Sequence, residues 1–203
     1  CNEKTYPGTV EVELIYTLSD DNSFDIEFIA NSNKDTIFNP TSHSYFNLGH
    51  EKTILSHELK INSNQILEID KNGIPTKNFL DIKDGPFDFQ NFKAIEKDIR
   101  ESNIQLKFGC GYDHNFILNS DKKFAAILFD KNSGRRLKIK TDQPGMQFYT
   151  GNYLGGNFIT NGGVCMETQH YPNSPNCDIF PSVILLKNKK FYTKTSYYFD
   201  IIE

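Results

Sequence analysis

The most regular feature of the sequence is an alternation of apolar and polar side chains near its beginning. Between residues 10 and 18 every second side chain is apolar, and Glu11 and Glu13 occupy two of the positions between them. A period of two residues is typical of a β-strand with one buried face. A polar cluster at residues 19–23 indicates a turn, and a second alternating run follows at residues 24–30. Together the two runs predict an antiparallel β-hairpin.

The same combination of short apolar runs and polar turns recurs along the rest of the chain. Further strands are expected at residues 59–61, 66–69, 124–129, 136–140, 183–186 and 193–201. The last four form two more predicted hairpins. Residues 91–101 have apolar positions at helical spacing and are the one expected helix. Short strands with frequent turns predict an all-β fold, an antiparallel sandwich or barrel, in a single domain spanning residues 1–203.

The composition supports this fold class and excludes several functions. The 203 residues include 17 Phe and 10 Tyr, which favour strands. A net charge of -4 argues against binding to a nucleic-acid backbone. No apolar run approaches the roughly 18 residues of a membrane helix, and no glycine-rich nucleotide-binding motif is present. We therefore expect a cytoplasmic protein with no nucleic-acid partner, no membrane partner and no nucleotide cofactor.

The four cysteines show neither metal-binding nor redox spacing. They are Cys1, Cys110, Cys165 and Cys177, with no C-x-x-C pair among them. Their even number leaves two disulfides open, but free thiols are the simpler interpretation for a chain with a large core.

Three stretches interrupt the strand pattern with polar residues that are costly to bury. Residues 39–48 contain His43 among hydroxyl and amide side chains. The second stretch has two glycines shortly before Asp113, and in the third Glu167 follows an apolar run. Burial of a carboxylate raises its pKa towards the range that suits a general base. Glu167 is therefore a candidate base.

Each of these residues also has a structural interpretation. His43 could be a hydrogen-bonded structural histidine, Asp113 could cap a turn, and Glu167 could lie on a strand surface. Because adjacent strand residues point to opposite faces, His114 and His170 are expected to face away from the neighbouring acids and to be structural. The histidines and acids lack H-x-H or H-E-x-x-H spacing, so no metal site is predicted.

Residues 39–48, NPTSHSYFNL, resemble the N-x-T-x-H-x-Y-F-N-L motif of the aldose 1-epimerases, or galactose mutarotases. Further segments agree with this family in the same order: residues 6–8 (YPG), 111–114 (GYDH), 144–152 (PGMQFYTGN) and 167–172 (ETQHYP). Asn173 stands where the family usually has Asp. The resemblance runs along essentially the whole chain. It implies a large antiparallel β-sandwich that interconverts the α and β anomers of a hexose such as galactose or glucose, with no cofactor and no metal.

The resemblance assigns the acid–base chemistry to two residues. Carried over by position in the motifs, His43 would be the general acid and Glu167 the general base. Mutarotation takes a proton from the anomeric hydroxyl and gives one to the ring oxygen, and an imidazole and a carboxylate on opposite sides of the sugar can do this in both directions.

The same resemblance places other side chains around the sugar. Asp113 would bind neighbouring sugar hydroxyls, and Gln147 would line the site. Ser44 and Tyr45 would flank His43. An aromatic side chain, Tyr45 or Phe148, would offer an apolar face to the sugar ring.

The resemblance is incomplete at the beginning of the chain. The family's domain has an N-terminal part that supplies an Asn-Arg pair and another histidine, and nothing in this sequence matches it. By length the chain resembles the C-terminal three-fifths of that domain, with unpaired strand edges that favour association. The expected partners are a hexose and either the N-terminal portion or a homodimer partner.

Other functions remain open at this point. One is a non-catalytic carbohydrate-binding module of the same fold, or an inactive fragment. Another is an epimerase of sugar phosphates, which needs clustered cations around the phosphate. The clustered arginines of this chain are Arg135 and Arg136, in a predicted hairpin.

Overall fold

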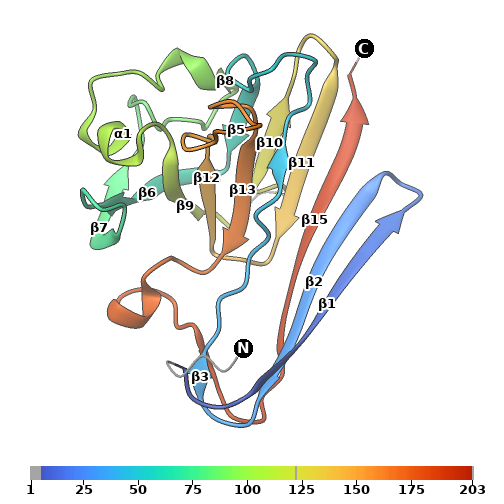
Figure 1. Cartoon of the computed structure of the whole chain (residues 1–203), viewed down its shortest axis with the longest axis vertical. Helices are drawn as coiled ribbons and strands as arrows, with labels where there is room; N and C mark the ends of the chain where they lie inside the picture. Colours follow the sequence, from blue (N-terminus) through green and yellow to red (C-terminus); the bar gives the residue numbers. More distant parts are fainter. Residues whose placement is uncertain (1–5, 122, 203) are drawn as a thin grey trace.

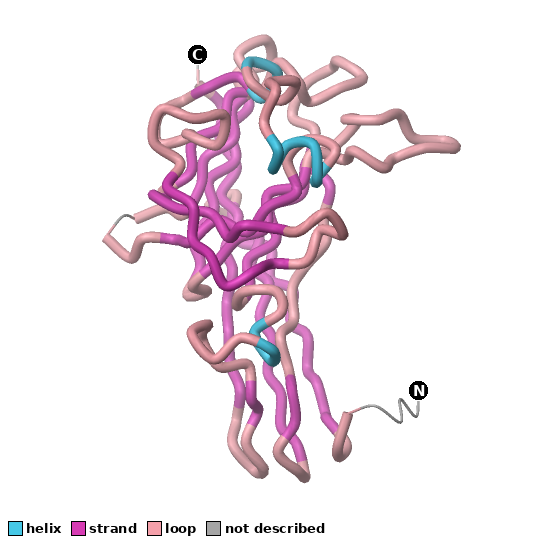
Figure 2. The backbone as a smooth tube through the Cα atoms, turned by 90° about the vertical axis from the view of Figure 1, so that its left-hand side faces the viewer, coloured by secondary structure: helices cyan, strands magenta, loops and turns pink. Residues whose placement is uncertain are grey.

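The regular secondary structure of the described residues is almost entirely antiparallel β-sheet. The computed structural model describes residues 6–121 and 123–202 (Figure 1), so Cys1 lies outside the described part. Figure 2 shows how little of the backbone is helical. The expected all-β antiparallel fold is confirmed. Among the described residues, no helix is long and apolar enough to cross a membrane.

Two large sheets and one small one contain all the strands of the described residues. The seven-stranded sheet contains, in spatial order, β1 (Val10–Ser19), β2 (Ser23–Ser32), β15 (Phe191–Ile201), β11 (Arg135–Thr141), β10 (Ala126–Phe129), β5 (Glu58–Ile61) and β8 (Lys93–Ala94). The six-stranded sheet contains β4 (Tyr45–Phe46), β13 (Val164–Gln169), β12 (Gly145–Tyr149), β9 (Asp113–Leu118), β6 (Ser63–Ile69) and β7 (Pro75–Asp81). The small sheet pairs β3 (Thr36–Ile37) with β14 (Ile184–Leu185).

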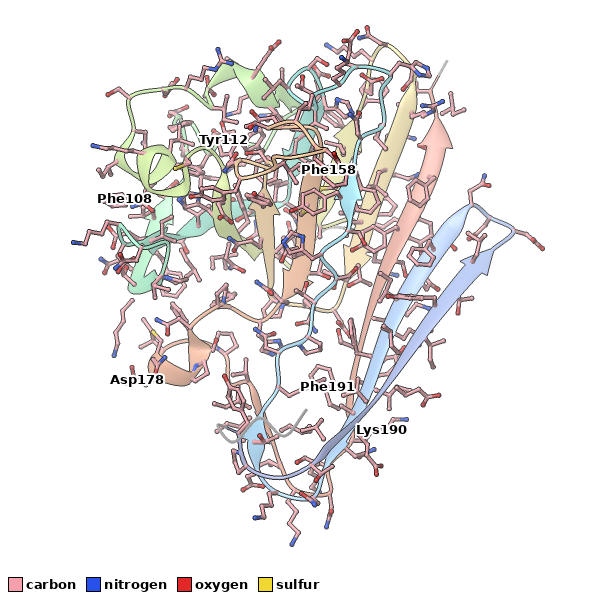
Figure 3. The ribbon with its side chains drawn as sticks, viewed as in Figure 1. Phe108, Tyr112, Phe158, Asp178, Lys190 and Phe191 are labelled. Atoms are coloured by element: carbon pink, nitrogen blue, oxygen red, sulfur yellow. The ribbon has the colours of Figure 1, made fainter. Side chains whose placement is uncertain are left out.

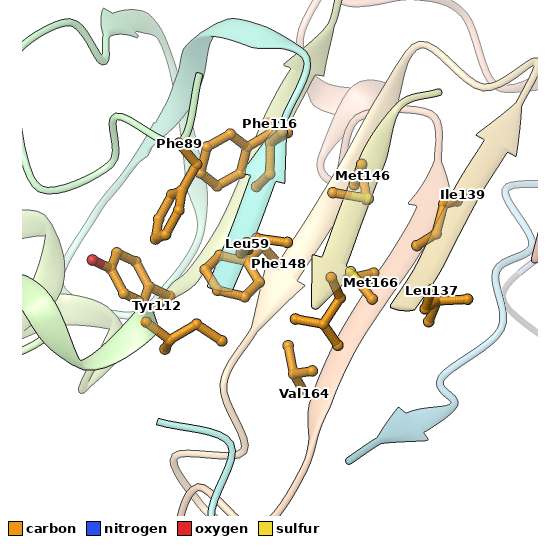
Figure 4. Packing of buried hydrophobic residues seen from close by; sticks show 14 of the residues in the cluster. Leu59, Phe89, Tyr112, Phe116, Leu137, Ile139, Met146, Phe148, Val164 and Met166 are labelled. Carbon is orange, nitrogen blue, oxygen red and sulfur yellow. The ribbon is translucent and has the colours of Figure 1, made fainter. Parts of the chain in front are cut away.

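The two large sheets share one apolar core. Alternate side chains of the central strands of both sheets point towards it, as the period of two residues requires. Figure 4 shows the core side chains of both sheets, which are at most 1% exposed: Leu59, Leu137 and Ile139 from the first, and Phe116, Met146, Phe148, Val164 and Met166 from the second.

The first predicted hairpin is confirmed, but its apolar face is not buried. β1 pairs with β2 from Val10–Ser32 to Ser19–Ser23. Leu14 is nevertheless 44% exposed and Leu18 is 80% exposed. The reason is position: β1 is the edge strand of the seven-stranded sheet, and in Figure 1 it extends away from the six-stranded sheet that covers the central strands.

The second predicted hairpin is confirmed as β10 and β11, whereas the third is wrong. β14 pairs with β3, and β15 lies between β2 and β11. The start of β15 is fixed by Phe191 (Figure 3), whose ring packs edge-on against Phe38 at a centroid distance of 5.1 Å. The expected strands at 59–61 and 66–69 exist as β5 and β6, in different sheets.

The predicted helix at residues 91–101 is also wrong. β8 pairs with β5 there, followed by a single 3-10 turn, η1 (Ile95–Lys97), whose Ile95 amide donates to His57 O. Sheet pairing thus uses backbone groups that a helix would need. The α-helix is α1 (Ile104–Gly109), capped by the Asn103 side chain, and a second 3-10 turn is η2 (Ser174–Asn176).

Substitution of two leucines that differ in burial tests this arrangement. Leu59 is 0% exposed and Leu18 is 80% exposed. We expect Leu59→Ala to lower the free energy of unfolding by about 2–5 kcal/mol, since it leaves a cavity in the core. The same substitution at Leu18 should change it by no more than about 0.5 kcal/mol. Urea unfolding of both variants measures the difference, and an equal cost at Leu18 would show that the apolar face of β1 is covered in solution.

Candidate active site

The candidate site is built on β13, whose alternating side chains separate the core from the chemistry. Val164 and Met166 point into the apolar core. Cys165 and Glu167 therefore point to the opposite face of the sheet. The apolar run before Glu167 thus contributes Val164 and Met166 to the core and Cys165 to the site.

The next two strands of the sheet, β12 and β9, add two polar side chains to the same face. Gln147 on β12 lies directly opposite Glu167, and Asp113 begins β9 opposite Tyr149. Gln147 Nε2 donates to Asp113 Oδ1 at 2.7 Å. The register of three antiparallel strands therefore brings Glu167, Gln147 and Asp113 together, as the motif resemblance implied.

His43 reaches this face from an irregular segment. Its Nε2 lies 3.4 Å from Glu167 Oε1, and its Nδ1 lies 3.4 Å from Cys165 Sγ. The His43 side chain is 55% exposed, whereas that of Glu167 is 10% exposed. An accessible imidazole thus faces a nearly buried carboxylate.

Polar side chains hold the segment of His43 alongside β13. Asn39 forms two hydrogen bonds with the backbone of His170, and Thr41 Oγ1 donates to Thr168 O at 3.0 Å. Two residues after His43, Tyr45 pairs with Cys165 across β4 and β13. The spacing of two between these positions is that of extended backbone, which explains the N-x-T-x-H-x-Y pattern physically.

The aromatic walls of the site differ from the expectation in one residue. Tyr45 is 46% exposed and its ring lies 5.1 Å from that of His43, centroid to centroid. Tyr149 lies edge-on to His43 at 6.1 Å. Phe148, expected as an alternative aromatic surface, is 0% exposed in the core, so it cannot touch a sugar. Tyr149 was not predicted as a site residue. Alternation along β12 nevertheless places it on the same face as Gln147.

Burial raises the pKa of both carboxylates. For Glu167 the main cause is desolvation, to which the nearby Asp113 adds and which His43 opposes. The pKa of Asp113 is raised by desolvation too, against the opposing effects of its hydrogen bond from Gln147 and of His43. A carboxylate with a raised pKa is the better proton acceptor, as a general base requires.

The other residues of the sequence motifs are Ser44, His114 and His170. The Ser44 hydroxyl hydrogen-bonds that of Ser42 at 3.0 Å. His114 is fully buried behind the sheet, its Nδ1 accepts from the Asp113 amide, and burial lowers its pKa to about 3, so it stays neutral. His170 hydrogen-bonds Gln143 at 2.8 Å. The latter two lie away from the acids' face, as predicted.

Cys165, like Tyr149, is a residue of this cluster that the sequence did not reveal. The described cysteines, Cys110, Cys165 and Cys177, are free thiols, as expected. One ligand atom each of His43, Cys165 and Glu167 lie within 4.8 Å of one another, a set that could hold a metal ion. The spacing of two between Cys165 and Glu167 was the available signal.

Comparison with known proteins agrees with the motifs. The family model described as aldose 1-epimerase matches residues 2–198. The galactose mutarotase of Sus scrofa is 34% identical, over 98% of this chain and 60% of its own length. The aldose 1-epimerase of Haemophilus influenzae is 36% identical, over 86% of this chain and 54% of its own length.

Solved structures show the same fold. An aldose epimerase homologue from C. elegans superposes with a TM-score of 0.92 at 23% identity, covering 100% of this chain and 64% of that one. The galactose 1-epimerase of Lactobacillus acidophilus gives a TM-score of 0.89 at 31% identity, covering 98% of this chain and 59% of that one.

These matches also correct one prediction. The description of the chain as a C-terminal three-fifths fragment is wrong as stated, because the family model and the alignments extend over nearly the whole of this chain. The chain spans about 60% of the length of the galactose mutarotases that it matches. On the match of residues 2–198, the chain belongs to the aldose 1-epimerase family.

Proposed function

We propose that this chain carries the acid–base pair of an aldose 1-epimerase acting on a hexose such as galactose or glucose, with Glu167 as base and His43 as acid. The observation that carries the proposal is the contact between the two groups. Glu167 Oε1, of a desolvated carboxylate with a raised pKa, lies 3.4 Å from Nε2 of the exposed His43 imidazole. Family membership agrees with this assignment.

The reaction needs two proton transfers. Glu167 takes the proton of the anomeric hydroxyl while protonated His43 gives one to the ring oxygen, and the bond between the anomeric carbon and the ring oxygen breaks. Rotation about the C1–C2 bond presents the other face of the aldehyde. The ring oxygen then attacks it, His43 recovers its proton, and Glu167 returns the proton to the new anomeric hydroxyl. A sugar entering the site takes the place of the direct His43–Glu167 contact.

Neighbouring side chains fit a neutral sugar. The Asp113 carboxylate accepts hydrogen bonds from hydroxyls, Gln147 donates and accepts, and Tyr45 offers a half-exposed ring. The epimerase of sugar phosphates gains no support, because Arg135 donates to Leu48 O and Arg136 binds Asp200, away from His43 and Glu167.

Removal of the base tests the proposed reaction. We expect the wild-type chain to accelerate the mutarotation of freshly dissolved α-D-galactose, followed by polarimetry. Glu167→Gln should lower the rate by roughly 10²–10⁴-fold, the usual contribution of a positioned acid or base. His43→Gln should act similarly, while the matched surface variants Glu11→Gln and His50→Gln should not. Equal rates for the wild type and Glu167→Gln would contradict the proposal, and galactose binding without acceleration would favour a carbohydrate-binding module.

The pH dependence tests the coupling of the two carboxylates. Glu167 must be ionised to act as base, so activity should rise with pH through its raised pKa, above the ordinary value of 4.5. Asp113→Asn removes a negative charge that disfavours this ionisation, and we expect the pKa of Glu167 to fall.

Carbon-13 NMR titration of the Glu167 carboxyl measures that pKa independently of activity. Asp20→Asn, in the exposed turn between β1 and β2, is the control and should leave it unchanged. An unchanged pKa in Asp113→Asn would show that the two carboxylates do not interact.

A further inference from the structure

Cys165 has no part in the proposed reaction, yet its thiol lies inside the site. Its Sγ is 3.4 Å from His43 Nδ1, and it shares one face of β13 with Glu167. A sulfur, an imidazole nitrogen and a carboxylate oxygen all lie within 4.8 Å of one another. This is a donor set of three different types gathered at one point.

We propose that His43, Cys165 and Glu167 form a binding site for a thiophilic divalent cation, with Zn²⁺ as the best fit, and that occupation of this site blocks the acid–base pair. The inhibition rests on the proposed function. The binding of the cation does not, and it can be measured without any sugar.

The separations of the donor atoms suit a tetrahedral ion. Zinc bonds are about 2.3 Å to sulfur and about 2.0–2.2 Å to nitrogen and oxygen, so neighbouring ligand atoms lie roughly 3.3–3.7 Å apart. Cys165 Sγ lies 3.4 Å from His43 Nδ1, Glu167 Oε1 lies 3.4 Å from His43 Nε2, and one ligand atom of each of the three residues lies within 4.8 Å of the others. Because one ion can bind only one nitrogen of the imidazole, the donors must approach one another by up to about 1 Å to reach tetrahedral separations. The half-exposed side chain of His43 can turn to allow this.

The chemistry of the donors selects the cation. Thiolate and imidazole favour zinc and similar soft or borderline ions, whereas Mg²⁺ and Ca²⁺ prefer sites made entirely of oxygen. The charge also balances, since one divalent cation neutralises one thiolate and one carboxylate. Asp113, close enough to raise the pKa of both Cys165 and Glu167, adds to the attraction for a cation.

Binding must release a proton. Burial, with Glu167 and Asp113 nearby, raises the pKa of Cys165 to about 12, against the opposing hydrogen bond from Tyr45, so the free site holds a thiol. Coordination forms the zinc–sulfur bond and breaks the S–H bond, and the proton passes to the buffer.

Occupation removes both catalytic functions together. A bound cation takes the lone pair of His43 and a carboxylate oxygen of Glu167, so neither group can exchange a proton with a sugar. The inhibition should be relieved by a chelator and weakened by high sugar concentration.

Titration with Co²⁺ and Zn²⁺ tests the site directly. Co²⁺ bound to a thiolate gives a charge-transfer absorption in the near ultraviolet, and calorimetry with Zn²⁺ gives stoichiometry and affinity. We expect one ion per wild-type chain and the absorption band. Cys165→Ser should lose the band and weaken Zn²⁺ binding by more than the roughly 10–100-fold that an outer-shell change costs. Circular dichroism checks that this variant is folded.

The other cysteines provide matched controls. Cys110→Ser and Cys177→Ser should keep both the band and the affinity. The proposal is overturned if Cys165→Ser binds Zn²⁺ as tightly as wild type, or if either control variant abolishes the band.

Inhibition is measured separately, as the rate with zinc relative to the metal-free rate of the same variant. Zinc should slow the wild type but not Cys165→Ser. Binding without inhibition would overturn the regulatory part. If the wild-type chain has no mutarotase activity, the proposed function fails, while the binding experiment still decides the metal site.

Discussion

His43 lies opposite Glu167 because an irregular segment is held extended beside β13. The hydrogen bonds of Asn39 and Thr41 to the β13 backbone and its continuation maintain this alignment, and the pairing of Tyr45 with Cys165 completes it. Each side-chain hydrogen bond contributes only about 0.5–1.5 kcal/mol. Together they determine the distance between the proposed acid and base, so residues that touch no substrate set the geometry of the site.

The second organising principle is the alternation of strand side chains. In β13, β12 and β9 one face supplies the core and the other supplies the chemistry. The packed face holds the backbone rigid, and this rigidity keeps Glu167 and Asp113 partly desolvated on the other face. The packing energy of the core offsets the free-energy cost of burying these two carboxylates, and their burial raises their pKa values.

The sequence predicted what depends on local pattern and missed what depends on distant pairing. Alternation found β1, β2, β10 and β11, and the composition supported the all-β class. The strand at 183–186 was recognised, but its partner, β3, lies some 150 residues earlier and leaves no local trace. Helical spacing at 91–101 was overridden by pairing of β8 with β5.

The site was predicted from motifs rather than from pattern. His43, Glu167, Asp113 and Gln147 meet as the family resemblance implied, although no local rule brings residues so far apart together. Cys165 was missed because it meets a histidine and a carboxylate rather than another cysteine, so the spacing of the cysteines carries no signal of it.

The position of β15 has a consequence for how the molecule forms. This strand inserts between β2 and β11, so β2 gains this neighbour only after residues 191–201 have been made, long after β2 itself. At about 5–20 residues per second, a ribosome takes on the order of ten seconds to cover that interval. During this time β2 has no partner on the side that β15 will occupy. The strand of the proposed base, β13, is also made in the later part of this interval. The pairing of β15 with β2 therefore closes a long loop, and contacts between residues so far apart in sequence are of the kind that slows folding.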